Sequence, residues 1–195
     1  MEQSQEHEKE DKKKTWAKRP PMDGSHAEEL VDHYWGSISY VAELIRASEI
    51  KAGLILSFYG IMLNFVYENI ELVLQQAATY QLLYVLSGLW FLIAGGSIYF
   101  SIKCFIPHIE AKYDKNVFFF GDVISKFGSI KEFSKTFYHI SLDEIELFDQ
   151  LGQQIYINSK IAAAKFKNVH RSIKLLGIQL VVLFIITTYY LLIIP

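Results

Sequence analysis

Hydrophobic residues in this chain are concentrated in long segments that contain almost no charge. Residues 72–102 and 175–195 contain no Asp, Glu, Lys, Arg or His, and residues 52–67 form a third segment of this kind. A bilayer core about 30 Å thick is crossed by roughly 20 apolar residues of α-helix. Core helices of a soluble protein are the alternative, but they rarely lack charge over such lengths. The pattern therefore predicts three membrane spans, at residues 52–74, 82–105 and 175–194.

Outside the spans, apolar residues recur at the three- and four-residue spacing of amphipathic helices. Residues 25–51 form one such helix, which no proline separates from the first span. A second helix begins near Leu142 and continues without proline into the third span, with Gly152 and Gly177 as its weak points. We expect an all-α membrane protein with three transmembrane helices, and a cytoplasmic helical bundle made of long helices continuous with the first and third spans. Such helices would either couple the bundle mechanically to the spans or simply anchor it.

Three Ser-x-x-Glu sequences precede helical patterns and resemble capping boxes. They begin at Ser25, Ser129 and Ser141, and each predicts the start of a helix there.

Lys and Arg near the span ends predict the orientation of the chain. Basic residues precede the first span, follow the second and precede the third, whereas the hairpin at residues 75–81 and the end of the chain have none. This distribution predicts a cytoplasmic N-terminus. The expected segments are a disordered tail at 1–24, a cytoplasmic amphipathic helix at 25–51, a two-span hairpin at 52–106, a cytoplasmic helical segment at 107–174 and the third span at 175–195.

Composition excludes some classes of function. The chain is 51% hydrophobic with a net charge of −2, which excludes a strongly basic nucleic-acid binder. The six histidines are dispersed, and no phosphate-binding loop or His-Glu-x-x-His sequence occurs. The single cysteine, Cys104, excludes a disulfide framework. We therefore expect a protein that is not an enzyme and that has neither a cofactor nor a metal site.

Small residues follow one face of the second span. Ser87, Ala94 and Ser101 recur every seven residues, with Gly88 and Gly95 beside them. Such a stripe lets helices approach closely in lipid. Part of it serves packing within the chain, and the surplus favours a homo-oligomer. A charge-free pore lining would select poorly among ions, which suits membrane disruption better than ion-specific conduction.

Residues 116–121, Asn-Val-Phe-Phe-Phe-Gly, differ from the helical segments around them. Three adjacent phenylalanines cannot all face one side of a helix, so the segment is expected to be a short extended piece or tight turn between helices. Gly121 is then expected to adopt a positive φ, which glycine does at little cost.

The order of these parts resembles the Pycsar effector family, the transmembrane anti-phage effectors encoded beside bacterial cyclic-pyrimidine-nucleotide synthases. An amphipathic helix runs into Arg46-Ala-Ser-Glu-Ile-Lys51-Ala, followed by a two-span hairpin, the 116–121 segment and a long helix into the last span. Members commonly carry an Asp-x-Lys-Ala step where this chain has Glu49 to Ala52, and a Leu-Phe-Phe-Gly step where it has Val117 to Gly121. The acidic residue here is thus Glu rather than Asp.

The resemblance implies a protein that senses a cyclic pyrimidine nucleotide, cyclic UMP or cyclic CMP, and impairs the bacterial inner membrane to arrest the infected cell. The ligand's phosphate would need a cation and its base an aromatic face. The implied ligand-binding residues are Arg46, Lys51, Asn116, Phe119, Phe120, Gly121 and Lys165. For Arg46 and Lys51, anchoring at the inner membrane edge is the alternative role. Alternative functions are a membrane toxin gated by another partner or nucleotide, and a membrane scaffold.

Overall fold

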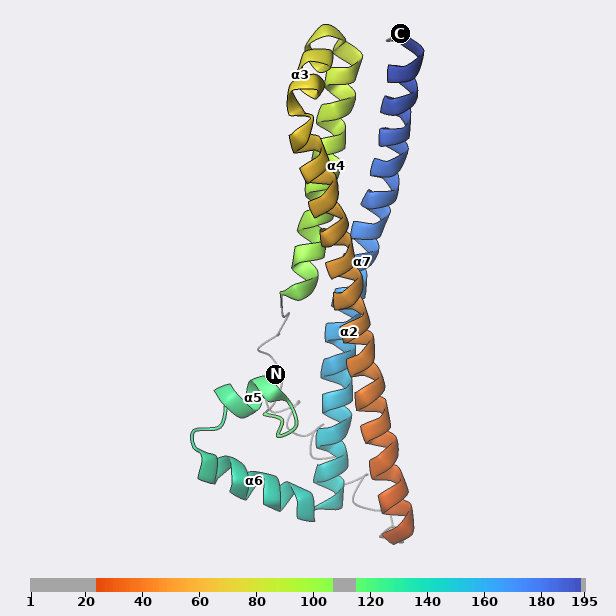
Figure 1. The fold of residues 1–195 in the computed structure, drawn as a ribbon. Coiled ribbons are helices and arrows are strands. Elements are labelled where there is room, and N and C mark those ends of the chain that lie inside the picture. Colours follow the sequence, from red (N-terminus) through yellow and green to blue (C-terminus); the bar gives the residue numbers. More distant parts are fainter. Residues whose placement is uncertain (1–23, 107–114, 194–195) are drawn as a thin grey trace, which may run out of the picture. The chain divides into compact units, whose positions relative to one another are not determined.

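The computed structural model describes residues 24–106 and 115–193, and every regular element in these residues is a helix. The elements are α2 (Gly24–Glu68), α3 (Ile70–Thr79), α4 (Gln81–Phe105), α5 (Phe120–Ser125), α6 (Ile130–Leu142) and α7 (Glu144–Ile193) (Figure 1). Three of them, α2, α4 and α7, are long and apolar enough to cross a membrane. The predicted all-α class with three spans is therefore confirmed. The predicted tail before Gly24 and the predicted helix end at Pro107 lie outside the described residues.

The chain divides into two compact units. Unit 1 contains the described residues 24–41 and 115–159, and unit 2 contains 42–106 and 160–193. Both α2 and α7 contribute residues to each unit. They are unbroken helices of 45 and 50 residues, as the absence of interior proline predicted. The two glycines proposed as weak points of α7 do not interrupt it.

In unit 2, the helices α2, α4 and α7 pack against one another along buried apolar side chains. Ile55 and Tyr59 of α2 contact Ala94 of α4, and Leu176 of α7 packs against the same cluster. A second cluster consists of Ala52, Cys104 and Val169. Each cluster joins all three helices, so burial of these side chains holds the bundle together.

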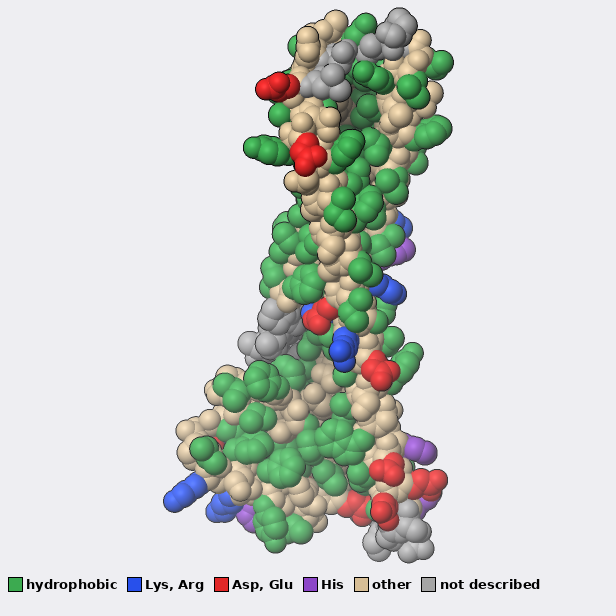
Figure 2. All heavy atoms as spheres, in the orientation of Figure 1, with side chains coloured by type: hydrophobic (Ala, Val, Ile, Leu, Met, Phe, Trp, Pro, Cys, Tyr) green, Lys and Arg blue, Asp and Glu red, His purple; other side chains and the backbone are tan. Residues whose placement is uncertain are grey.

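The outer surface of unit 2 is rich in apolar side chains, as Figure 2 shows in green. The large residues exposed by more than 60% include Leu54, Ile61, Phe65, Leu92, Phe184 and Leu191. Water would disfavour such a surface, whereas hydrocarbon chains match it. The backbone polar groups are at the same time bonded within helices, as a lipid environment demands.

The first span and the hairpin differ from the prediction. Instead of one helix over 52–74, α2 ends at Glu68 and α3 begins at Ile70. The side chain of Asn69 donates to the carbonyl of Phe65 at 2.9 Å, and such side-chain bonds compete with the helical pattern. Only Tyr80, in an extended conformation, separates α3 from α4, so the turn is shorter than the predicted 75–81. Helices α3 and α4 pack side by side (Figure 1).

One of the three predicted capping boxes is confirmed. Ser129 caps α6, because its Oγ accepts from the backbone N–H of Glu132 at 3.2 Å. Ser25 lies inside α2, which begins at Gly24, so its predicted position before the helix is wrong.

The third box is also wrong, because Ser141 lies in the last turn of α6 and donates to the carbonyl of Phe137. The residue that caps the start of α7 is Asp143 instead. Its Oδ1 accepts from the backbone N–H groups of Ile145 and Glu146 at 3.0 and 3.1 Å. A carboxylate suits this position because it satisfies unpaired N–H groups and the helix dipole together.

Gly121 has its place in the first turn of α5, and no described glycine has a positive φ. The predicted positive φ is therefore wrong. The reason for glycine is steric, because a Cβ at this position would lie 2.8 Å from Cε1 of Phe119. That ring is buried, so it has little room to move.

Two glycine substitutions in unit 1 are expected to have opposite effects. Gly121→Ala should lower the free energy of unfolding by about 1–2 kcal/mol through overpacking against Phe119. Gly152→Ala should raise it by about 0.5–1 kcal/mol, since alanine favours a helix. A Cβ at Gly152 would lie 3.8 Å from Cε1 of Tyr34, an ordinary contact. Denaturant unfolding of the full chain in detergent micelles measures both, and equal effects would contradict the steric explanation.

Candidate functional site

The residues expected to bind a ligand divide between the two units. Unit 1 contains Asn116, Phe119, Phe120 and Gly121, whereas unit 2 contains Arg46, Lys51 and Lys165. The two groups are described in turn below.

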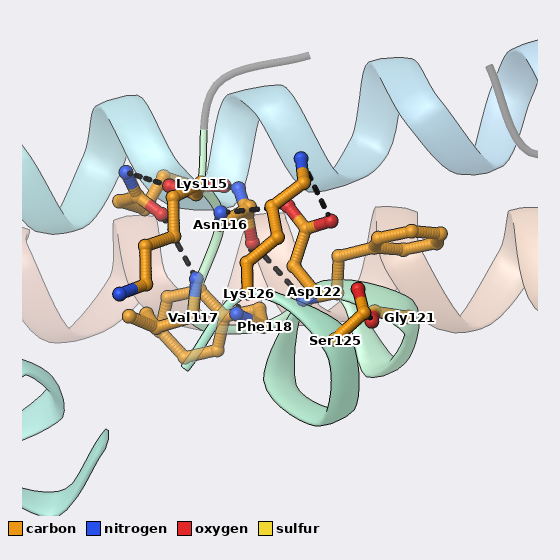
Figure 3. A network of polar contacts seen from close by, with 10 residues as sticks. Lys115, Asn116, Val117, Phe118, Gly121, Asp122, Ser125 and Lys126 are labelled. Atoms are coloured by element: carbon orange, nitrogen blue, oxygen red, sulfur yellow. Dashed lines mark hydrogen bonds and ion pairs between the residues drawn. The ribbon is translucent and has the colours of Figure 1, made fainter. Parts of the chain in front are cut away.

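Asn116 is fully buried, and its side-chain amide and backbone N–H are bonded within unit 1 (Figure 3). Its Nδ2 donates to the carbonyl of Gln150 at 2.7 Å. Its Oδ1 accepts from the backbone N–H groups of Phe118 and Phe119, at 2.8 and 3.1 Å. Its own backbone N–H donates to Oδ2 of Asp122 at 2.9 Å. Asn116 thus makes a turn of the kind that asparagine favours and fixes the direction of the whole segment.

Gln150 fastens the same segment to α7. Its Oε1 accepts from the backbone N–H of Val117 at 3.1 Å, and its Nε2 donates to the carbonyl of Lys115 at 3.4 Å. The irregular residues before α5 therefore obtain from side chains the bonds that a helix would give them.

Charged groups surround this segment. Asp122, almost buried, forms an ion pair with Lys126 at 3.0 Å. The Nζ of Lys115 lies 3.1 Å from Glu132 and 3.8 Å from the centre of the Phe127 ring. The hydrogen bond from Lys115 holds the pKa of the Glu132 carboxyl below its ordinary value.

The three adjacent phenylalanines point in different directions, as predicted. Phe119 is buried, whereas Phe120 is 78% exposed. Phe118 joins a row of aromatic rings that the sequence did not reveal, with centroids 5.1–5.8 Å apart. The row runs through Trp35, Phe118, Phe137, Phe133 and Phe127. Edge-to-face contacts at these separations are favourable, so the row stabilises unit 1.

Lys165 joins the three long helices of unit 2. Its Nζ donates to Oε1 of Glu49 on α2 at 2.7 Å and to the carbonyl of Cys104 on α4, also at 2.7 Å. The side chain of Lys165 is 8% exposed and that of Glu49 is 38% exposed. Sequence reasoning identified Lys165 but missed Glu49 as its partner. The carbonyl belongs to the last turn of α4, where helices carry unpaired acceptors and partial negative charge.

Arg46 and Lys51 are both exposed on α2. Arg46 lies three residues before Glu49 and therefore about one helical turn from it. The Nζ of Lys51 lies 5.9 Å from the centre of the Phe166 ring, within range of a cation–π contact. Both cations are accessible for lipid headgroups or for an anionic ligand.

The structure divides the small residues of α4 between two surfaces. Ala94 and Ser101 are buried within unit 2, and Ser87 is half-buried. A Cβ on Gly88 or Gly95 would meet no atom within 4 Å, so these glycines lie on an open surface. The first set serves packing within the chain, and self-association through the second set stays a prediction.

Neutral polar residues inside unit 2 were missed. Ser97 and Ser172 are fully buried and bond to each other at 2.9 Å, and Tyr59 donates to Oε1 of buried Gln179. Two signals were available in the sequence, namely the four-residue spacing of Ser97 and Ser101 and the presence of an amide within the third apolar segment.

Comparison with known proteins decides the family. A family model described as the Pycsar effector protein domain matches residues 33–192. The chain belongs to the Pycsar effector family. As a Pycsar effector with three candidate spans, it is an anti-phage membrane effector. No curated protein and no solved structure matches it.

Residues 49–52, Glu-Ile-Lys-Ala, correspond to the Asp-x-Lys-Ala sequence common in Pycsar effectors. The structure shows what two of these residues contact. The acidic residue, Glu49, is the one that pairs with Lys165, and Ala52 is fully buried beside Cys104 and Val169. These residues thus place a carboxylate at the edge of the α2–α7 contact and a small side chain at its centre.

Asn116→Ala should lower the free energy of unfolding by about 3 kcal/mol, because it leaves buried backbone groups without partners. Asn116→Asp should cost at least as much, since it buries an unpaired carboxylate against the carbonyl of Gln150 that now accepts from Nδ2. Denaturant unfolding of the full chain in micelles measures both, with the exposed Ser134→Ala as control. Equal losses for Asn116→Ala and Ser134→Ala would contradict the assigned role.

Lys165→Met should destabilise the protein by about 2 kcal/mol, between the values for exposed and fully buried ion pairs. Combined with Glu49→Gln, the loss should be smaller than the sum of the single losses by about 1 kcal/mol. Lys167→Met removes an exposed lysine on the same helix. Its loss of unfolding free energy should simply add to that of Glu49→Gln, with no coupling between the two. The coupling is obtained from unfolding of the four chains of each cycle in micelles, and an additive Lys165 cycle would contradict the pairing.

Proposed function

We propose that this Pycsar effector binds a cyclic pyrimidine nucleotide in the cytoplasm and then impairs the integrity of the bacterial inner membrane. Family membership and the three candidate spans support a role at the membrane. The Lys and Arg residues around the spans support a cytoplasmic N-terminus. The infected cell would then stop growing because its membrane no longer holds an ion gradient.

The observation that carries this proposal is the position of Lys165. One ammonium group ties α7 to both α2 and α4, through Glu49 and the carbonyl of Cys104. Glu49 is more exposed than the lysine it pairs with, so an anion from solution can compete for its place. A phosphate offers the same charge-assisted bonds as a carboxylate.

The ligand would act by exchange of partners. The phosphate of the nucleotide would pair with Lys165, and Arg46, one turn from Glu49, would add a second cation. Displaced Glu49 would no longer connect α2 to α7. The nucleotide shifts the bundle toward the separated state only by the difference in its affinity for the two states.

The pyrimidine base would also need an aromatic face. Phe166, which is 36% exposed and lies beside Lys51 in unit 2, offers such a face.

Purified protein in vesicles that contain calcein provides the test. Addition of cyclic UMP or cyclic CMP, each in turn, should release the dye from wild-type vesicles. Lys165→Met should leak without nucleotide and no longer respond to it, because the bundle loses the pair that holds α2 to α7 and the phosphate loses its cation. Glu49→Gln should lower the nucleotide concentration for half-maximal release by about tenfold, because glutamine competes with the phosphate for Lys165 less well than glutamate does. A tenfold change corresponds to about 1.4 kcal/mol. Lys167→Met, the matched control, should behave as the wild type.

Three results would contradict the proposal in different ways. Release from wild-type vesicles without nucleotide would indicate that the protein is gated otherwise. If neither dye nor protons cross with either nucleotide, although the protein is shown to be inserted, a scaffold or a different activating ligand would be favoured. A full response by Lys165→Met would place the phosphate elsewhere.

A further inference from the structure

A line of neutral polar side chains lies inside unit 2, from Ser172 just before the predicted third span to Gln179 within it. Ser97 and Ser101 of α4 and Ser172 of α7 are all fully buried. The Oγ atoms of Ser97 and Ser101 lie 2.9 and 2.7 Å from that of Ser172. Ser172 Oγ also lies 2.9 Å from the carbonyl of Ser97, and Ser97 Oγ 3.0 Å from the carbonyl of Ser172. Each hydroxyl is therefore within bonding distance of another helix.

A second polar pair belongs to the same interior. Tyr59 of α2 and Gln179 of α7 are each 1% exposed, and the tyrosine hydroxyl donates to Oε1 of the glutamine. The Nε2 group of Gln179 has no acceptor among the described residues, and neither has Nε1 of Trp90, which is 4% exposed. Tyr59, Ser97, Ser101, Ser172 and Gln179 are called the polar seam below.

Packing alone does not account for the polar seam. An apolar residue of similar size at Gln179 would avoid an unpaired amide N–H, which costs about 1–3 kcal/mol in a protein interior. Serine and glutamine side chains in spans ordinarily hydrogen-bond between helices, whereas a donor left without an acceptor serves no such contact. The unpaired donors of Gln179 and Trp90 would bind water if it entered between the helices.

We propose that the polar seam forms the cytoplasmic part of the route by which protons cross the membrane once α2, α4 and α7 separate. This inference rests on the proposed impairment of the membrane and specifies what passes. Serine and tyrosine hydroxyls both donate and accept, so together with water they form a continuous hydrogen-bonded chain. A hydronium ion at the cytoplasmic end gives a proton to the first hydroxyl, each hydroxyl and bound water passes one on, and water beyond Gln179 receives one. No group gains or loses a proton overall.

The chemistry of the seam also sets its selectivity. The seam carries no charge that would attract or repel an ion, and its hydroxyls need only thin threads of water to relay a proton. A bulky anion such as calcein requires a much wider opening. Proton flux should therefore begin at lower nucleotide concentrations than dye release.

Proton flux is measured in vesicles with pyranine inside and a pH step outside, in the presence of cyclic UMP or cyclic CMP. Ser172→Ala and Gln179→Met should reduce the flux severalfold, because each interrupts the chain with an apolar group. The matched control is Thr187→Val, since Thr187 is exposed on α7 and bonds only to the carbonyl of Leu183. The control should conduct as the wild type.

Water in the seam is tested directly with a thiol reagent that reacts only in an aqueous environment. In a Cys104→Ala background, Ser97→Cys should be modified after nucleotide is added and protected before. Thr187→Cys, exposed on the outside of the bundle, should be protected in both conditions. This readout does not change if the serine merely supports packing.

The outcomes separate this inference from the proposed function. If the wild type leaks but Ser172→Ala and Gln179→Met conduct equally well, or Ser97→Cys stays protected, the seam is not the route and the proposed function stands. Calcein release at the same nucleotide concentrations as proton flux would also overturn the inference, in favour of general rupture. If the wild type passes neither protons nor dye, the proposed function fails and this inference fails with it.

Discussion

The pairing of one buried ammonium group determines how the membrane-crossing helices fit together. Among the described residues of unit 2, Lys165 is the charged residue that packing buries, and a buried charge is tolerated only when paired. Its two partners come from different helices, Glu49 from α2 and the Cys104 carbonyl from the end of α4. Any rearrangement that moves one helix away must therefore offer the ammonium group another anion. Apolar contacts impose no such condition, because the hydrophobic effect is not directional.

The requirement that buried polar groups be paired also explains the irregular segment of unit 1. Residues 115–118 lie outside the helices, yet Asn116 and Val117 are buried. The amides of Asn116 and Gln150 replace helical hydrogen bonds, and Asp122 accepts the remaining N–H. Burial is thus possible without regular structure, at the cost of fixing the identity of each side chain involved. An apolar residue at any of these positions would leave a backbone group unpaired.

The sequence was sufficient for features that depend on local pattern. Charge-free segments located the spans, and α4 begins one residue before its predicted start at Leu82. The absence of proline anticipated the length of α7. The Lys165–Glu49 pair joins residues 116 apart, and no periodicity records such a contact. Gly121 was identified for a positive φ, which it does not adopt. Its actual role is to leave room for the Phe119 ring, and the sequence could not reveal this because the position of that ring is a result of folding.

Unit 2 combines two kinds of polarity, and their energies differ. Opening the polar seam exchanges hydrogen bonds between side chains for bonds with water, a change of only about 0.5–1.5 kcal/mol per bond. Removing the partner of a fully buried ammonium group costs about 3–5 kcal/mol unless a new anion replaces it, and the exposure of Glu49 lowers this to about 2 kcal/mol for Lys165. The ion pair is therefore the largest single polar interaction between the closed helices, and the bonds of the seam add several smaller ones. In the proposed mechanism, a bundle built in this way stays closed without ligand and still contains a path that water can enter. An anion that pairs with Lys165 would remove the largest single barrier, and hydration of the seam would follow bond by bond.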